Sequence, residues 1–324
     1  MRYLVDVISA ASMRSYFAVD GVTSATTKAE GGGDNHPDEV RQEAAIGFNE
    51  LLQGGLLKGG SFSLNALYSR EHDYSSFTLA GSFSYLLAKK NTTLQLGMVR
   101  SWDRSFPQIR TWTRRKEVYT PSFTLTQVLT PKLIAQLLFS YNRTSGYIGD
   151  PYQVVQVIDG GQVRNFETNV PDERVRKAVG GRLNYKLGQK SALNFAVRYY
   201  WDSWDVNSFT TSLLLQRHLS KAATLGLGYR NYLQKRAYFF RPQYAAPELY
   251  MTVDTKLDKG YSNDYEIKLT LNGGHYRLPV LSNPNVQLNV LMNLYHRHSE
   301  TPDWHSRYQD LFAYIFSFGA RYRF

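Results

Sequence analysis

The 324-residue sequence contains no cysteine, which excludes disulfides, thiolate metal sites and a cysteine nucleophile. It also lacks any run of about twenty apolar residues, so it has no candidate transmembrane helix. The HExxH, Walker and GxSxG motifs are absent, as is GxGxxG in a strand-to-helix context. A hydrolase of the barrel-phospholipase kind would need His218 beside a serine such as Ser208, Ser212 or Ser220, and the sequence does not assign that pairing. We therefore expect no enzyme, no catalytic residue and no cofactor.

Positive charge is abundant, with a formal net charge of +11, but it is not clustered. Lys and Arg are spread over the strands, without a long basic run or a nucleic-acid-binding motif. We therefore do not expect nucleic acid as a partner.

Aromatic residues are plentiful, with 24 Tyr and 17 Phe, and the last fifteen residues show how they are arranged. In residues 310–324 (DLFAYIFSFGARYRF), aromatic side chains alternate with small or cationic ones. Side chains of a strand alternate between its two faces, so this segment has an aromatic face and a polar face. That pattern fits either the last strand of a soluble sandwich or a strand between lipid and a wet lumen.

The same alternation recurs along the chain and predicts about fourteen strands, although twelve or sixteen would also fit. The expected strands are residues 3–8, 41–52, 61–69, 75–87, 92–102, 117–128, 133–142, 174–187, 192–201, 207–219, 223–232, 261–271, 285–297 and 310–324. Short connections alternate with long ones, and the long ones are residues 9–40, 103–115, 143–172, 236–260 and 298–309. Transmembrane barrels have short periplasmic turns and long external loops, whereas a soluble sandwich has no reason to sort loop length in this way. We predict a single-domain (1–324), all-β, antiparallel up-and-down transmembrane β-barrel in the outer membrane of a Gram-negative bacterium.

The N-terminus has no charged segment followed by an apolar one, so no signal peptide is recognisable. Residues 3–8 already read as a strand. We expect that barrel sequence is missing upstream, because this strand is a short partner for the last one.

Four stretches resemble one bacterial family: residues 5–12 (VDVISAAS), 171–176 (PDERVR), 198–204 (RYYWDSW) and 229–240 (YRNYLQKRAYFF). The family is the one catalogued as domain of unknown function 3570. The first stretch departs from its pattern, with Ala10 and Met13 where Gly and Pro are usual. The resemblance implies an outer-membrane-type barrel and supplies no chemistry.

The polar faces of the later strands carry basic residues, which predicts a basic lumen that attracts anions. The alternative is that these charges pair with acids on neighbouring strands and fill the barrel. The candidates are Arg174, Arg176, Arg182, Lys186, Arg198, Arg230, Lys268, Arg297, Arg321 and Arg323.

Aromatic residues at strand ends predict contacts with the membrane interface. Tyr199, Trp201 and Trp204 would form a girdle, with Asp202 capping the following turn, although a platform for stacking a ligand is an alternative. The loop at 238–244 (YFFRPQY) is interpreted as an external loop packed on its own aromatics, or else as an inward constriction. On the last strand, Phe312, Tyr322 and Phe324 would lie at the interface, with Phe324 as a signal for the outer-membrane assembly machinery.

His296 and His298 lie on one strand face near Glu300, Asp303 and His305, but nothing specifies a third ligand, so we expect no metal site. The favoured function is a channel or translocation pore for small, anionic solutes. One alternative is a closed anchoring barrel that binds a periplasmic or surface partner. Another is a transporter of hydrophobic compounds. In each case outer-membrane lipid surrounds the barrel.

Overall fold

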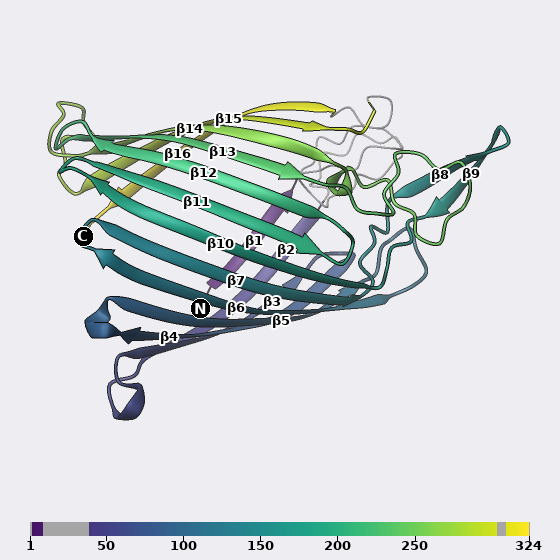
Figure 1. The fold of residues 1–324 in the computed structure, drawn as a ribbon, viewed down its shortest axis with the longest axis horizontal. Helices are drawn as coiled ribbons and strands as arrows, with labels where there is room; N and C mark the ends of the chain where they lie inside the picture. The colour runs from purple at the N-terminus through teal and green to yellow at the C-terminus, as the bar shows by residue number, and fades with distance from the viewer. Residues whose placement is uncertain (1, 9–38, 303–308, 324) are drawn as a thin grey trace.

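The computed structural model describes residues 2–8, 39–302 and 309–323, which form one antiparallel meander of fourteen strands and a separate two-stranded hairpin. Each strand of the large sheet pairs with the strands before and after it in the sheet (Figure 1). These strands are β1 (Arg2–Ile8), β2 (Glu39–Leu51), β3 (Gly60–Arg70), β4 (Tyr74–Leu87), β5 (Thr92–Ser105), β6 (Arg114–Thr130), β7 (Leu133–Gly146), β10 (Glu173–Leu187), β11 (Ser191–Asp202), β12 (Asn207–His218), β13 (Ala223–Gln234), β14 (Gly260–Asn272), β15 (Val286–Ser299) and β16 (Asp310–Tyr322).

All fourteen predicted segments are strands of this sheet, but the long connection expected over residues 143–172 holds structure of its own. It contains the hairpin of β8 (Val154–Asp159) and β9 (Gln162–Glu167). Gly160 and Gly161 make its turn with φ of 57° and 82°, a conformation that favours glycine. The expectation of an irregular loop was wrong here.

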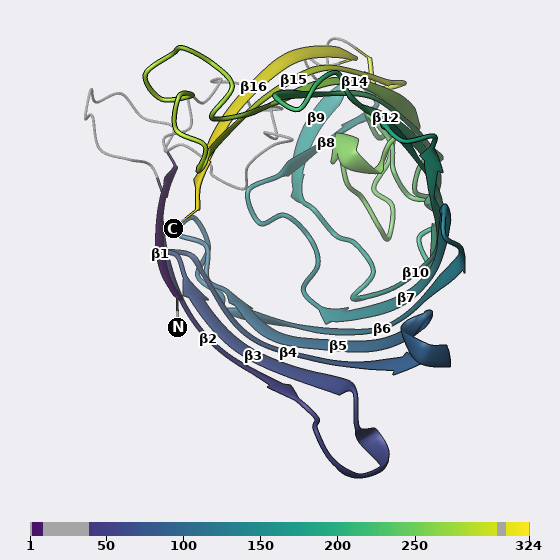
Figure 2. The same cartoon turned by 90° about the vertical axis from the view of Figure 1, so that its left-hand side faces the viewer.

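The sheet curls strongly, so its two faces differ in exposure (Figure 2). One set of alternating positions carries large apolar side chains that point outward, and Phe318 of β16 is 79% exposed. The other set shares the concave face, where side chains converge and are more covered. This separation follows directly from the two-residue period of a strand.

The two ends of the curled sheet differ as predicted. Short turns lie at the left end in Figure 1, and the long connections with β8 and β9 lie at the right end. The short-turn end includes the 3-10 helices η1 (Gly55–Leu57) and η2 (Ala88–Lys90), and Gly188 turns there with φ of 64°. The long-loop end includes η3 (Thr255–Leu257). Among the described residues, no helix is long and apolar enough to cross a membrane.

The edge strands β1 and β16 are drawn at the same side of the ring in Figure 2. β1 has seven residues and β16 has thirteen. In the described ranges, β1 pairs only with β2 and β16 only with β15, so no hydrogen-bonded ladder joins the two edges.

Candidate functional site

Strands β10 to β16 place the predicted lumen bases on one face. The register sets Gly180 opposite Arg198, Ser212 opposite Arg230, and Gly226 opposite Lys268. On the same face, Ser262 lies opposite Arg297 and Gln287 lies opposite Arg321. Arg323 follows β16 two residues after Arg321 and so belongs to this face as well. The face that carries these bases is the concave one, because the exposed apolar side chains lie on the other face.

Acids on this concave face are fewer than the bases, and they are Asp202, Asp264 and Glu266. Among the candidate bases, Arg174 alone has an ion pair with a described residue, and its partner is Asp202. Asp264 accepts a hydrogen bond from Asn293 Nδ2 at 2.9 Å.

The other concave bases differ in their surroundings. Arg176 Nη1 donates to Asn142 Oδ1 at 2.9 Å and Thr144 Oγ1 at 2.8 Å, while the Arg198 guanidinium lies 5.6 Å from the ring centre of Tyr200. Arg230 lines a small polar cavity of about 240 Å³ with Tyr232, Ser262, Asp264 and Tyr295. Arg297 Nε is buried without a hydrogen-bond partner in the described part of the chain.

The concave face of β3 to β7 is neutral by comparison. Its charged residues lie near the long-loop end: Asp103 and Lys116, which pair with each other at 3.2 Å, and Arg114 at the start of β6. Between them and the short turns the face carries mainly hydroxyl and amide side chains, which bond across strands. Ser63 bonds Ser82 at 2.7 Å and Thr78 bonds Ser101 at 2.7 Å.

An anchor at the long-loop end is built around Asp202, whose carboxylate is fully buried. Its Oδ2 accepts from Arg174 Nε at 2.8 Å and from the Tyr200 hydroxyl at 2.5 Å. Its Oδ1 accepts from the backbone amides of Trp204 and Val206 at 2.9 and 3.0 Å, so the predicted turn cap is confirmed. The Arg174 guanidinium also lies 4.2 Å from the ring centre of Trp204.

Trp204 corrects one prediction, because it is 3% exposed and does not lie at the lipid interface. Its ring packs edge-on against Phe239 at 5.1 Å, in a core cluster with Val206, Phe240 and Leu257. Tyr199 and Trp201 do stack on each other, at 5.5 Å between ring centres, and their interface role stays a prediction.

The connections after β7 and β13 together form a cap at the long-loop end, defined here as residues 147–172 and 235–259. A second core cluster joins Val155 and Val157 of β8 to Tyr244, Met251 and Val253 of the later connection. The loop at 238–244 therefore packs on the hairpin and on Trp204 as well as on its own aromatics.

A buried glutamine links the two segments of the cap. Gln153 Oε1 accepts from the hydroxyls of Thr168 and Thr252, at 2.6 and 2.7 Å, and from the Val253 amide at 3.0 Å. The sequence carried no signal for the contact between the segments, because Thr252 and Val253 lie about a hundred residues from Gln153.

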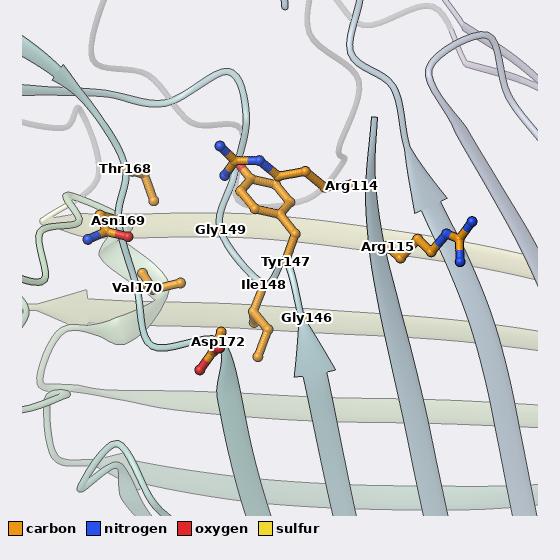
Figure 3. A pocket seen from close by; sticks show the side chains of 10 residues that line it. All are labelled: Arg114, Arg115, Gly146, Tyr147, Ile148, Gly149, Thr168, Asn169, Val170 and Asp172. Carbon is orange, nitrogen blue, oxygen red and sulfur yellow. The ribbon is translucent and has the colours of Figure 1, made fainter. Parts of the chain in front are cut away.

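Beside the cap lies a pocket of about 370 Å³, shown in Figure 3. The Arg114 guanidinium sits over Tyr147 at 4.8 Å and over Trp112 at 4.2 Å from the ring centres. Burial raises the pKa of Tyr147 to about 12. Thr168, Asn169 and Asp172 line the side opposite Arg115 (Figure 3); the remaining lining residues are Gly146, Ile148, Gly149 and Val170.

His296 Nε2 and His298 Nδ1 both approach Asp310 Oδ1, each at 3.0 Å. Within the described ranges no group of three or more ligating side chains is arranged to hold a metal ion. Asp303 and His305 lie outside the described residues, as does Phe324. Phe312 and Tyr322 are exposed on the outer face of β16.

His218, the histidine weighed for a hydrolase, contacts Thr224 Oγ1 through Nδ1 at 2.8 Å. Ser208 lies near the other end of β12, and Ser220 Oγ accepts the amides of Ala222 and Ala223. These contacts bring none of the three serines to His218.

A family model described as "Protein of unknown function (DUF3570)" matches residues 99–307, which confirms the resemblance and leaves residues 5–12 outside the match. Among curated proteins, no sequence matches the chain. Solved structures do resemble it. The siderophore receptor PirA from Pseudomonas aeruginosa is 13% identical with a TM-score of 0.52, covering 80% of this chain and 46% of that one.

CdiB from Acinetobacter baumannii is also 13% identical, with a TM-score of 0.50 and coverage of 88% of this chain and 51% of that one. The ferric enterobactin receptor PfeA is 11% identical, with a TM-score of 0.53 and coverage of 92% and 49%. The chain thus spans about half the length of these structures. Likeness at such identities establishes the fold alone, which is that of outer-membrane β-barrels.

Proposed function

The chain belongs to the DUF3570 family, and we propose that it is an outer-membrane channel with a positively charged lumen that passes small anionic solutes. No catalytic step is part of this function. The channel would lie with its short turns in the periplasm and its cap outside the cell, as barrels of this fold do.

The observation that carries the proposal is the imbalance of charge on the concave face of β10 to β16. The bases there outnumber Asp202, Asp264 and Glu266, and Arg174 alone is neutralised by an ion pair with a described residue. Unpaired cations along a narrow polar passage raise the local concentration of anions and lower the barrier to their entry. The alternative that these bases merely fill the barrel in ion pairs is supported among the described residues by the Arg174–Asp202 pair alone.

The outer face supports placement in a membrane. Large apolar side chains such as Leu213, Leu227, Ile267 and Phe316 are exposed on neighbouring strands. Such a continuous apolar band is unfavourable in water and favourable against lipid tails.

Reversal-potential measurements in a planar bilayer test the channel. We expect the wild type to conduct with a preference for chloride over potassium, and Arg182→Gln to weaken that preference. Arg182 is exposed and has no ion pair with the described residues, whereas Arg176 is hydrogen-bonded to Asn142. Substitution of Arg182 therefore tests the charge more directly than substitution of Arg176. Arg100→Gln is the matched control, because Arg100 lies on the convex face and pairs with Glu117 at 3.1 Å. Cation selectivity, or no current from protein that is folded by heat-modifiable gel migration, would overturn the proposal.

The cap favours a second candidate, a closed barrel that anchors a periplasmic or surface partner. Two buried clusters give the cap a core of its own, which a simple flexible loop would not have. Folded protein that fails to conduct would favour this function over the channel.

A further inference from the structure

We infer that the solute is a polyhydroxylated anion, meaning a short sugar chain that carries carboxylate or phosphate groups. The inference rests on the proposed channel and names the class of its solute. It comes from the two chemically different walls of the lumen and from the pocket beside the cap.

The first wall is the neutral one on β3 to β7. Across strands, Ser63 bonds Ser82, Thr78 bonds Ser101, and the Asn142 amide donates to Thr120 Oγ1 at 2.7 Å. Each hydroxyl can donate once and accept twice, so these paired groups retain capacity for a further partner. Such a wall exchanges hydrogen bonds with sugar hydroxyls without desolvating a charge.

The second wall is the basic one on β10 to β16. Arg182, Arg198 and Arg230 form no ion pair or hydrogen bond with a described residue, so an incoming anion displaces no protein partner there. A guanidinium presents donors in a fixed fork that matches carboxylate and phosphate oxygens. This wall therefore recognises the acidic groups of the solute.

The pocket beside the cap repeats the same combination in one place. The Arg114 guanidinium covers the Trp112 and Tyr147 rings without a described hydrogen-bond partner, and Thr168 and Asn169 lie across the pocket (Figure 3). Trp112 Nε1 is buried without a partner in the described part of the chain. A cation beside aromatic rings and short polar groups suits an acidic sugar ring, which has apolar C–H faces and a charged edge.

Other solutes would use only part of these surfaces. An inorganic anion or an acidic peptide needs the basic wall alone, and a neutral sugar needs the hydroxyl wall alone. An acidic sugar chain is the class that uses both walls and the pocket.

The test is occlusion of single-channel current by three solutes added to the cap side. Trigalacturonate carries charge and hydroxyls, triglutamate carries charge without sugar hydroxyls, and maltotriose carries hydroxyls without charge. We expect half-occlusion by trigalacturonate at a concentration at least about tenfold lower than by either of the others, since one additional charge-assisted or cooperative set of hydrogen bonds is of that order. Equal occlusion by trigalacturonate and triglutamate would overturn the inference, and so would equal occlusion by maltotriose.

Direct binding keeps the inference testable if no current is found. Titration calorimetry on the full chain in detergent compares the same three solutes. Preferential binding of trigalacturonate without conductance would support the inferred class of solute and contradict the proposed channel. Anion-selective current with no preference among the three solutes would support the channel and contradict the inferred class of solute.

Two variants separate the contributions of the pocket and of the hydroxyl wall. Arg114→Gln should weaken trigalacturonate by about tenfold and leave maltotriose unchanged. Ser122 of β6 lies on the same concave face, opposite Ser140. Ser82→Ala combined with Ser122→Ala should weaken trigalacturonate severalfold and leave triglutamate unchanged. Arg100→Gln, on the convex face, should change none of these values, and an equal loss for all three solutes in the Ser82 and Ser122 variant would contradict the role of the hydroxyl wall.

Discussion

The two halves of the inner wall have the same strand geometry and different chemistry. On β3 to β7 the concave face is neutral except at the long-loop end, where it carries the Asp103–Lys116 pair and Arg114, whereas on β10 to β16 cations are in surplus along the face. Their outer faces are alike, with exposed residues such as Phe62 and Phe195. The outer face must be apolar along the whole sheet, but the inner face has no such constraint. In the channel that we propose, the difference between the halves would serve binding of the solute rather than folding.

Ion pairs differ between the halves as well. Arg174 and Asp202 are 12% and 0% exposed, and they join the basic wall to the cap. Arg100 and Glu117 of the neutral half are 50% and 54% exposed, on the outer face. A buried pair that loses one partner leaves a desolvated charge, while an exposed pair is replaced by water at little cost.

The largest effect is therefore expected from Asp202→Ala, which leaves the Arg174 guanidinium without its partner and removes three further hydrogen bonds that the same carboxylate accepts. We expect a loss of about 3–5 kcal/mol in the stability of the cap. Glu117→Ala, the matched control in the other half, should cost no more than about 1 kcal/mol. Hydrogen exchange of residues 147–172 in detergent measures both, and similar losses for the two variants would show that the anchor is not special.

The period-two pattern was enough to predict every strand of the large sheet, because a lipid-facing row must be apolar along its whole length. Asp202 as a turn cap was also predictable, since its amide donors are two and four residues away. Contacts between distant segments were not. The burial of Trp204 depends on Phe239, and the Arg174 pair depends on the register of β10 against β11. The β8–β9 hairpin was missed because Gly and Asp dominate its surroundings.

The next largest effect is expected from exchanging the charge of the two walls. Arg182→Ser with Arg198→Ser should reduce the chloride-to-potassium permeability ratio by about an order of magnitude, because the local anion concentration falls. Ser82→Arg with Ser122→Arg, on the neutral wall, should raise the ratio instead. Reversal potentials under a salt gradient measure both changes. If selectivity follows neither exchange, the concave face does not line the conducting path.

A smaller effect is expected within the neutral wall, at the Ser63–Ser82 pair. Ser63→Ala alone should cost about 1 kcal/mol in the stability of the barrel, since it leaves the other hydroxyl without its partner. The double variant with Ser82→Ala should cost less than the sum of the two single variants, because it leaves no unpaired group. Urea unfolding in detergent measures the double-mutant cycle, and simple additivity would mean that water already replaces this bond.

The smallest effect concerns the cap and Glu300, which pairs with Arg236 and Lys259 of the cap; Asp150 of the cap and Glu300 respond to pH in opposite ways. Burial is the main cause that raises the pKa of Asp150, against a backbone hydrogen bond from the Tyr152 amide at 2.9 Å that lowers it. The hydrogen bond from Lys259 is the main cause that lowers the pKa of Glu300. A raised carboxyl pKa means that the folded state binds the proton more tightly than the unfolded state. Asp150 therefore favours the folded cap increasingly as pH falls through its folded pKa, and the effect is complete below its ordinary pKa. The lowered pKa of Glu300 favours folding above its ordinary value and ceases to do so as pH falls through its folded value.

Asp150→Asn should therefore slow hydrogen exchange of residues 147–172 slightly at pH 7, because an uncharged amide avoids the desolvation and its oxygen can still accept from Tyr152. The gain should disappear at low pH, where the native carboxyl is itself protonated. Glu300→Gln, which removes the ion pairs to Lys259 and Arg236, should do the opposite at pH 7 and speed exchange slightly. Exchange that is faster in Asp150→Asn at pH 7 would mean that the carboxylate is stabilised in the folded cap, and the assignment of burial as the dominant influence on Asp150 would be wrong.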